Sequence, residues 1–307
     1  MARLSVIAAL AASMLVVVVA GAQAAPVTLD PVLVGPKDDE SPAATAGGDY
    51  LSFVRRRPGP NFKFDMWVRH GSDPLVKVNR HGQAFAGGID GNQLVYQLVY
   101  HQHTTIRFYN LVTHGRRRPP RGVNEPGAAS FFPSISGHWL LFGRERFGRR
   151  DRLILRNMTR RPGTSRVLDE VTTRHHALFP GQVNGGWAAW TRITIRHGIF
   201  RASVRDYRIS TKATSLISRP SGTNQYAASV DPQGRVFYVR SGLGCGKHVV
   251  IREHLPGGGD TALAALPAGS DIFTTFAVDE GGGQTTVYFD RIKCSTGQGD
   301  IYKLQVP

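Results

Sequence analysis

The side chains of this sequence that could do chemistry are mostly arginines, which stand in short segments between apolar runs. Ten cations form the candidate binding set: Arg56, Arg57, Arg144, Arg146, Arg149, Arg150, Arg192, Arg240, Lys247 and Arg291. Guanidinium groups present planar forks of N–H donors that match the oxygens of carboxylate, sulfate and phosphate. Acidic residues are few in the same segments, so the pattern predicts an anion-binding surface.

Five arginines hold one repeated position, two residues after an aromatic residue: Arg55, Arg144, Arg192, Arg240 and Arg291. On a strand this spacing places the two side chains on the same side. They form either a ring of guanidinium groups around a channel mouth or contacts to carbonyls and acids of neighbouring units. Because repeats copy structural residues first, the second interpretation is favoured for these five. The non-repeated arginines are the better binding candidates.

Cys245 and Cys294 are the only cysteines. They stand in equivalent segments of two successive repeats, and an even count in an exported chain favours pairing. The sequence therefore predicts a disulfide, with free thiols or a two-cysteine metal site as the alternatives.

Motifs for catalysis are weak. His101-x-His103 and His175-His176 lack nearby residues that would complete a metal site. The glycine-rich stretch 241–247 lacks the first glycine and the hydroxyl residue of a phosphate loop. The chain has no Gly-x-Ser-x-Gly elbow and no convincing pair of carboxylates. We therefore predict no catalytic residue, no metal and no cofactor, although a catalytic group assembled from distant segments stays open.

An internal repeat determines where the arginines and cysteines lie in the fold. The segments 51–55, 94–98, 140–144, 188–192, 236–240 and 287–291 read alike, and their central aromatics recur every 43 to 51 residues. The fifth repeat divides into strands at 225–230, 235–240, 247–254 and 261–266, separated by Pro/Gly turns. Four strands in one such repeat are typical of a β-propeller blade. Six repeats predict an all-β, six-bladed propeller of four-stranded antiparallel blades.

The other repeats follow this template. Third strands are predicted at 62–68, 105–111, 152–157, 199–209 and 300–306, and fourth strands at 74–79, 165–168 and 213–217. In the second repeat, 116–125 is too rich in Pro and Arg for an assignment. The sixth repeat stops after its third strand, and an open edge strand invites aggregation. We expect the extended run 27–34 to supply the missing outer strand.

The first 24 residues are predicted to be a secretory signal peptide. Arg3 is followed by an apolar run from Leu4 to Ala20 and by the small-x-small sequence Ala22-Gln23-Ala24. The alternative is a retained membrane anchor. With cleavage, residues 25–307 form the propeller, without a membrane span, in the secreted, periplasmic or envelope compartment.

The turn Asp231-Pro232-Gln233-Gly234, the aromatic second strands and Asp300-Ile301-Tyr302 resemble the TolB-type, WD-repeat-like propellers of bacterial envelopes. The resemblance covers 50–307 and implies a six-bladed propeller. Such propellers serve as scaffolds, binders and parts of enzymes, so the resemblance alone does not assign an activity.

The formal charge of +16 favours polyanionic partners, although an Arg-rich composition would also give it. Together these features predict a monomeric, non-catalytic binding propeller with a basic loop face. The expected partner is an acidic protein or an anionic polysaccharide or other envelope polymer, and no specific nucleic acid. The alternative is an enzyme, a glycan lyase or hydrolase, with its site in the mouth of the central channel.

Overall fold

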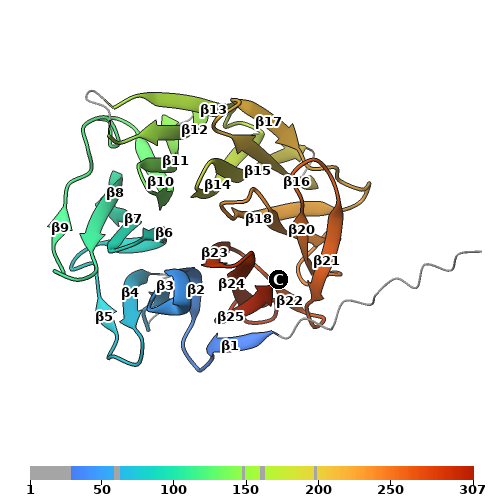
Figure 1. Cartoon of the computed structure of the whole chain (residues 1–307), viewed down its shortest axis with the longest axis horizontal. Coiled ribbons are helices and arrows are strands. Elements are labelled where there is room, and N and C mark those ends of the chain that lie inside the picture. The colour runs from blue at the N-terminus through green and yellow to red at the C-terminus, as the bar shows by residue number, and fades with distance from the viewer. Residues whose placement is uncertain (1–28, 59–62, 102, 147–148, 160–162, 197–198) are drawn as a thin grey trace, which may run out of the picture.

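Six small antiparallel sheets stand around a common axis, as Figure 1 shows. The computed structural model describes residues 29–58, 63–101, 103–146, 149–159, 163–196 and 199–307. The predicted signal peptide, residues 1–24, lies outside these residues. The fold confirms the prediction of an all-β, six-bladed propeller, and the resemblance to TolB-type propellers holds for its architecture.

Blades 1 to 5 are four-stranded meanders, numbered from the innermost strand outward. Blade 1 contains β2 (Asp39–Ala44), β3 (Tyr50–Arg56), β4 (Phe64–His70) and β5 (Val76–Lys77). Blade 2 contains β6 (Gln83–Asp90), β7 (Gln93–Tyr100), β8 (His103–Asn110) and β9 (Arg116–Arg117). Blade 3 contains β10 (Ala129–Ser136), β11 (Trp139–Arg146), β12 (Arg150–Asn157) and β13 (Ser165–Thr172).

The remaining blades complete the ring. Blade 4 contains β14 (His176–Asn184), β15 (Trp187–Arg196), β16 (Ile199–Arg208) and β17 (Ala213–Leu216). Blade 5 contains β18 (Asn224–Val230), β19 (Val236–Ser241), β20 (Val250–His254) and β21 (Asp260–Ala265). Blade 6 contains β22 (Ser270–Asp271), β23 (Thr275–Gly281), β24 (Gln284–Lys293), β25 (Gly299–Val306) and, from the other end of the chain, β1 (Asp30–Leu33).

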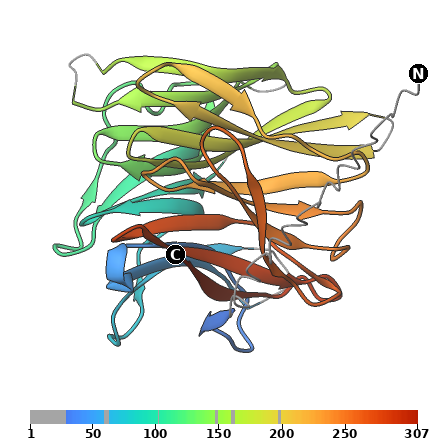
Figure 2. The ribbon, with the colours of Figure 1, turned by 45° about the vertical axis from the view of Figure 1, so that its right-hand side comes forward.

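The closing strand is confirmed. β1 pairs antiparallel with β25, with Asp30 opposite Lys303 and Pro31 opposite Tyr302. Figures 1 and 2 show this blue N-terminal strand beside the red C-terminal blade. Its four residues lie within the predicted run 27–34. After β1 the chain crosses from blade 6 to blade 1, and we call this crossing, residues 34–38, the strap.

The repeated aromatics form the cores between blades. All six lie on the second strand of their blade and are at most 2% exposed: Phe53, Tyr96, Phe142, Trp190, Tyr238 and Phe289. A large ring at the same place in every blade fills the space between successive twisted sheets. This explains why the second strand carries the clearest repeat in the sequence.

Some strand boundaries differ from the sequence prediction for identifiable reasons. The fourth strands of blades 1 and 2 are only two residues long. A proline, which cannot donate to a ladder, stands two residues before the first of them and two residues after the second. The first strand of blade 6 is split into β22 and β23. In the gap, the backbone N–H groups of Phe273 and Thr274 donate to the carboxylate of Asp290 instead of to a strand.

Helical structure in the described residues is limited to one short 3₁₀ turn, Ala46–Gly48. No described helix has the length and apolar character needed to cross a membrane.

Candidate functional site: an apolar funnel at the loop face

The loops that join second and third strands all lie on one side of the ring, which we call the loop face. Because the blades are antiparallel, the beginnings of the innermost strands lie on this side as well. A cavity of about 990 Å³ opens here around the axis. We call it the funnel. Innermost strands from all six blades contribute to it, together with β15, β16 and the loop after β19.

Aromatic side chains of the innermost strands give the funnel its apolar wall. Phe132, Phe179, Tyr226 and Phe273 all line it, and they recur every 47 residues in the sequence. The rings of Phe132 and Phe179 stack with their centroids 5.6 Å apart. These residues are absent from the predicted binding set, because the repeat that predicts the blades lies on the second strands. Their constant spacing is the signal that would have found them.

β-bulges present Phe132, Phe179 and Tyr226 to the axis, while Phe273 lies in the gap between β22 and β23. In blades 1 to 5 the pairing of first and second strands shifts at the same level. Phe132 and Ala227 there have φ of 45° and 53°, a left-handed conformation that non-glycine residues seldom adopt. Gly181 is required at its bulge, because a Cβ would lie 2.1 Å from the carbonyl oxygen of Ala228. The bulges thus turn the strands so that apolar side chains face the channel.

Gln182 crosses the inner end of the funnel. The lining residues of β14 stop at Gly181, and the buried Gln182 amide follows directly. It donates to the carbonyl oxygen of Ala277 at 2.7 Å and accepts from the N–H of Ala277 at 2.8 Å. Its oxygen also accepts from the N–H of Val230. One side chain therefore links blades 4, 5 and 6 across the channel.

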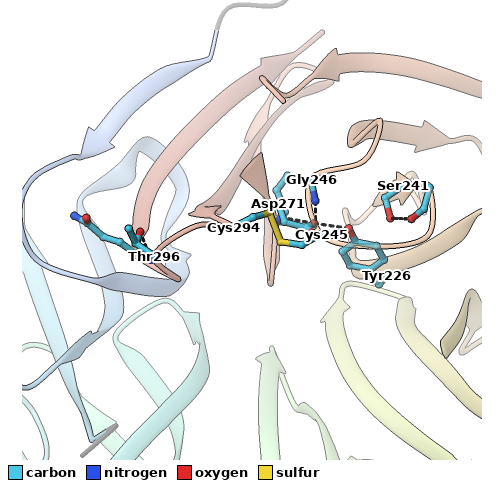
Figure 3. Close-up of a disulfide and its surroundings, with 10 residues drawn as sticks. Tyr226, Ser241, Cys245, Gly246, Asp271, Cys294 and Thr296 are labelled. Carbon is cyan, nitrogen blue, oxygen red and sulfur yellow. Dashed lines mark hydrogen bonds between the residues drawn. A yellow bond between two sulfur atoms is a disulfide. The ribbon is translucent and has the colours of Figure 1, made fainter. Parts of the chain in front are cut away.

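A small polar cluster of the wall lies beside the disulfide, as Figure 3 shows. The hydroxyl of Tyr226 donates to Asp271, whose carboxylate also accepts from the backbone N–H of Gly246. Burial, followed by the hydrogen bond to Asp271, raises the pKa of Tyr226. Tyr226 and Asp271 both line the funnel, and Asp271 is the only carboxylate among its described lining residues.

The predicted disulfide is present. Cys245 and Cys294 are bonded, with their Cα atoms 5.9 Å apart, and join the loop after β19 to the loop after β24. Both sulfurs lie near the Asp271 carboxylate, the one grouping of metal-ligand types found in the described residues. While the sulfurs are bonded to each other they offer no thiolate to a metal.

The repeated arginines make contacts within the protein. Arg144 donates to Glu125 at 2.6 Å and to two carbonyl oxygens on the connection from blade 2. Arg192 pairs with Asp169 of blade 3 at 3.2 Å. Arg240 pairs with Asp260 at 2.6 Å.

The other two repeated arginines, Arg55 and Arg291, also contact groups within the protein. Arg55 forks onto Asp39, with N–O distances of 2.5 and 2.8 Å. The guanidinium of Arg291 lies 4.6 Å from the centroid of the Tyr302 ring. Each of the five thus contacts an acid, a carbonyl or an aromatic ring of the protein.

The non-repeated cations lie around the loop face in separate places. Arg146 and Arg150 are exposed and pair with Glu125 and Glu170 respectively. Arg149 and Lys247 are exposed as well.

Arg56 and Arg57 belong together. They line a second cavity, of about 560 Å³, beside the strap. The lining of the funnel, as far as the chain is described, contains no arginine or lysine.

Comparison with known proteins supports the fold. No protein-family model and no curated protein sequence matches the chain. Among solved structures, TolB from Acinetobacter baumannii matches with a TM-score of 0.52 and 13% identity, over 84% of this chain and 64% of that one. The chain thus spans less than two thirds of that TolB chain.

The β-propeller domain of the Trilobed protease from Pyrococcus furiosus matches with a TM-score of 0.51 and 11% identity, over 87% of this chain and 79% of that one. That domain is described as having an open velcro topology, whereas β1 closes the ring here. At these identities the likeness concerns architecture, and the chain has the six-bladed propeller fold of TolB.

Proposed function

We propose that this protein is an exported, non-catalytic binding propeller whose funnel receives apolar side chains of an extended segment from an acidic protein. The proposal rests on the funnel, on the charge around it and on the sequence before residue 25.

Exposed apolar side chains at the funnel carry the proposal. Five large hydrophobic residues that line it are 42 to 48% exposed: Ile195, Ile199, Phe200, Leu243 and Phe273. Monomeric soluble proteins rarely expose contiguous apolar patches without a use for them, and concave apolar sites are typical of binding. The funnel is therefore the part of the described surface best suited to a partner.

Charge around the funnel selects the kind of partner. Arg196 and Arg201 are exposed on the hairpin that carries Ile195 and Phe200, and the exposed Lys247 follows Cys245 by two residues. These rim cations, on a chain whose formal net charge is +16, attract acidic segments and speed their encounter. An apolar wall suits protein side chains better than a strongly hydrated polysaccharide. An acidic protein is thus favoured over an anionic polymer at this site.

The enzyme alternative has less support. Glycoside hydrolysis ordinarily uses two carboxyl groups across the scissile bond. The described lining of the funnel offers Asp271 alone, and this carboxylate already accepts hydrogen bonds from Tyr226 and Gly246.

Export is supported by two features. The apolar run from Leu4 to Ala20 ends at a small-residue cleavage sequence. The Cys245–Cys294 disulfide suits an oxidising compartment.

Peptide binding tests the proposal. The probe is an array of immobilised 12-residue peptides that vary in apolar and acidic content, read at low and high salt. We expect only peptides that contain both apolar and acidic residues to be retained, and we expect their binding to weaken as the salt concentration rises. A double variant, Phe200→Ser with Leu243→Ser, should raise the Kd at least tenfold.

Leu216→Ser is the matched control. Leu216 is 61% exposed on β17, outside the funnel lining, so this variant should bind as the native protein does. If no peptide binds, or if funnel and control variants bind equally well, the proposal is wrong. Binding of a polyuronate that the funnel variant abolishes would instead assign the funnel to an anionic polymer.

A further inference from the structure

We infer that the second cavity, between the strap and blade 1, is a binding site for an acidic sugar, a uronate. This site does not depend on the funnel. Its walls come from the strap, the end of β3, the start of β4 and the loop between β24 and β25. At about 560 Å³ it falls in the size range of small-molecule sites and greatly exceeds the volume of an inorganic anion.

The cavity carries an excess of positive charge. Lys37, Arg55, Arg56 and Arg57 line it, against the two carboxylates Asp38 and Asp65. The ion-pair partners of Arg55 and Asp65 outside the lining, Asp39 and Lys77, add one charge of each sign and leave the excess at two. The pocket therefore favours an anionic ligand.

Two of the arginines are held in fixed orientations. Arg55 donates hydrogen bonds to the Asp39 carboxylate from Nε and Nη2, and Arg57 donates to the Asp65 carboxylate from the same two nitrogens. Arg57 also donates to the carbonyl oxygen of Gly82. Within the described part of the chain, the Nη1 groups of Arg55 and Arg57 donate no hydrogen bond to a protein atom. Guanidinium groups positioned in this way lose little entropy when they bind a carboxylate.

Trp67 supplies an apolar surface beside the cations. Its ring is half-buried, lines the cavity and lies 5.9 Å from the guanidinium of Arg55. The C–H faces of a sugar ring pack against flat aromatic surfaces, whereas a sulfate or phosphate ion gains nothing from them. A ligand that uses both parts of the pocket has a ring and a carboxylate, which describes a uronate.

Ligand binding would also join two parts of the ring. Lys37 belongs to the strap, while Arg56 and Arg57 belong to blade 1. An anion held between them ties the strap to the first blade, and a ligand that binds only the folded state stabilises it by mass action.

Three probes test the site: sodium glucuronate, the neutral glucose and sodium sulfate, at equal ionic strength. We expect glucuronate to raise the melting temperature and to bind in calorimetry. Glucose should do neither, and sulfate should give a smaller shift. Lys37→Gln combined with Arg56→Gln should raise the glucuronate Kd at least tenfold.

Lys212→Gln, at an exposed lysine on the turn between β16 and β17, matches the charge change of Lys37→Gln and should leave the Kd unchanged. Lys37→Gln alone, at an exposed position of the strap, serves if the double variant does not fold; its Kd should rise at least threefold. Equal shifts from sulfate and glucuronate, or an unchanged Kd in the pocket variants, would overturn the inference. Peptide binding by the funnel is measured on the same variants and should persist, so failure of one site is distinguishable from failure of the other.

Discussion

At the scale of single residues, the junction of blades 1 and 6 contains an unusual pair of acids. Asp290 is fully buried and accepts three backbone N–H bonds and one hydroxyl bond. Burial, followed by the charges of Asp290 and Asp38, raises the pKa of Glu40 to about 8. Burial raises the pKa of Asp290 as well, but the three N–H groups and the hydroxyl around it favour its ionised form, and we therefore expect the proton on Glu40.

Replacing Glu40 by Gln should reduce the pH dependence of stability. The folded pKa lies above the unfolded value near 4.5, so the native state binds this proton more tightly. The resulting stabilisation is complete below about pH 4.5 and is lost as the pH rises through about 8. Thermal unfolding at constant ionic strength should show that Glu40→Gln loses less melting temperature between pH 5.5 and 8.5 than the native protein.

Asp49→Asn, at an exposed carboxylate on the connection between β2 and β3, is the control and should keep the native pH slope. Equal slopes for Glu40→Gln and the native protein would show that Glu40 ionises normally.

Individual site residues could be predicted only in part. Cysteine pairing followed from two residues in equivalent loops, and the repeated arginines from their position after an aromatic. Their partners could not be predicted, because Asp169 and Glu125 come from neighbouring segments that meet Arg192 and Arg144 only when the ring forms. The funnel was not predicted because its walls depend on bulges. The only sign of it in the sequence is a Phe or Tyr that recurs every 47 residues.

At the scale of elements, strand order followed from the repeat while strand ends did not. Second strands are nearly continuous apolar runs, and their hairpins contain Gly at positions such as Gly137 and Gly185, where φ is 55° and 53°. The split between β22 and β23 depends on the Asp290 side chain, which arrives from β24. Such a long-range contact leaves no local pattern in the sequence.

Deleting residues 25–34 should open the ring. β25 would lose its outer partner β1, with which Lys303, Tyr302 and Ile301 pair. An exposed edge strand favours association between chains. We expect aggregation or a markedly lower melting temperature, measured by light scattering and calorimetry. A truncated protein that stays monomeric and melts like the native one would show that β1 is dispensable.

At the scale of the whole molecule, a strand pairing and a covalent bond help to hold blade 6 in the ring. β1 attaches it to blade 1 on one side, and the disulfide attaches its loop to blade 5 on the other. The sequence separation of the two cysteines is 49, so the bond restricts the unfolded chain considerably.

Replacing both Cys245 and Cys294 by Ser should lower the free energy of unfolding by up to about 4 kcal/mol, on the loop-entropy model. Urea unfolding measures the loss, and the native protein in reductant should match the variant. Because the loop after β19 forms part of the funnel wall, peptide binding should weaken too. An unchanged unfolding midpoint in the variant and in reductant would contradict this account.

The pairing of β1 with β25 also orders events in time. Blades 1 to 5 are built from contiguous segments, so their contacts are local and form early. The outer strand of blade 6 is made first and its partner last, with Asp30 opposite Lys303. Contacts between such distant residues slow folding. A chain still being synthesised can assemble blades but cannot close the ring, and it remains an open arc until β25 emerges.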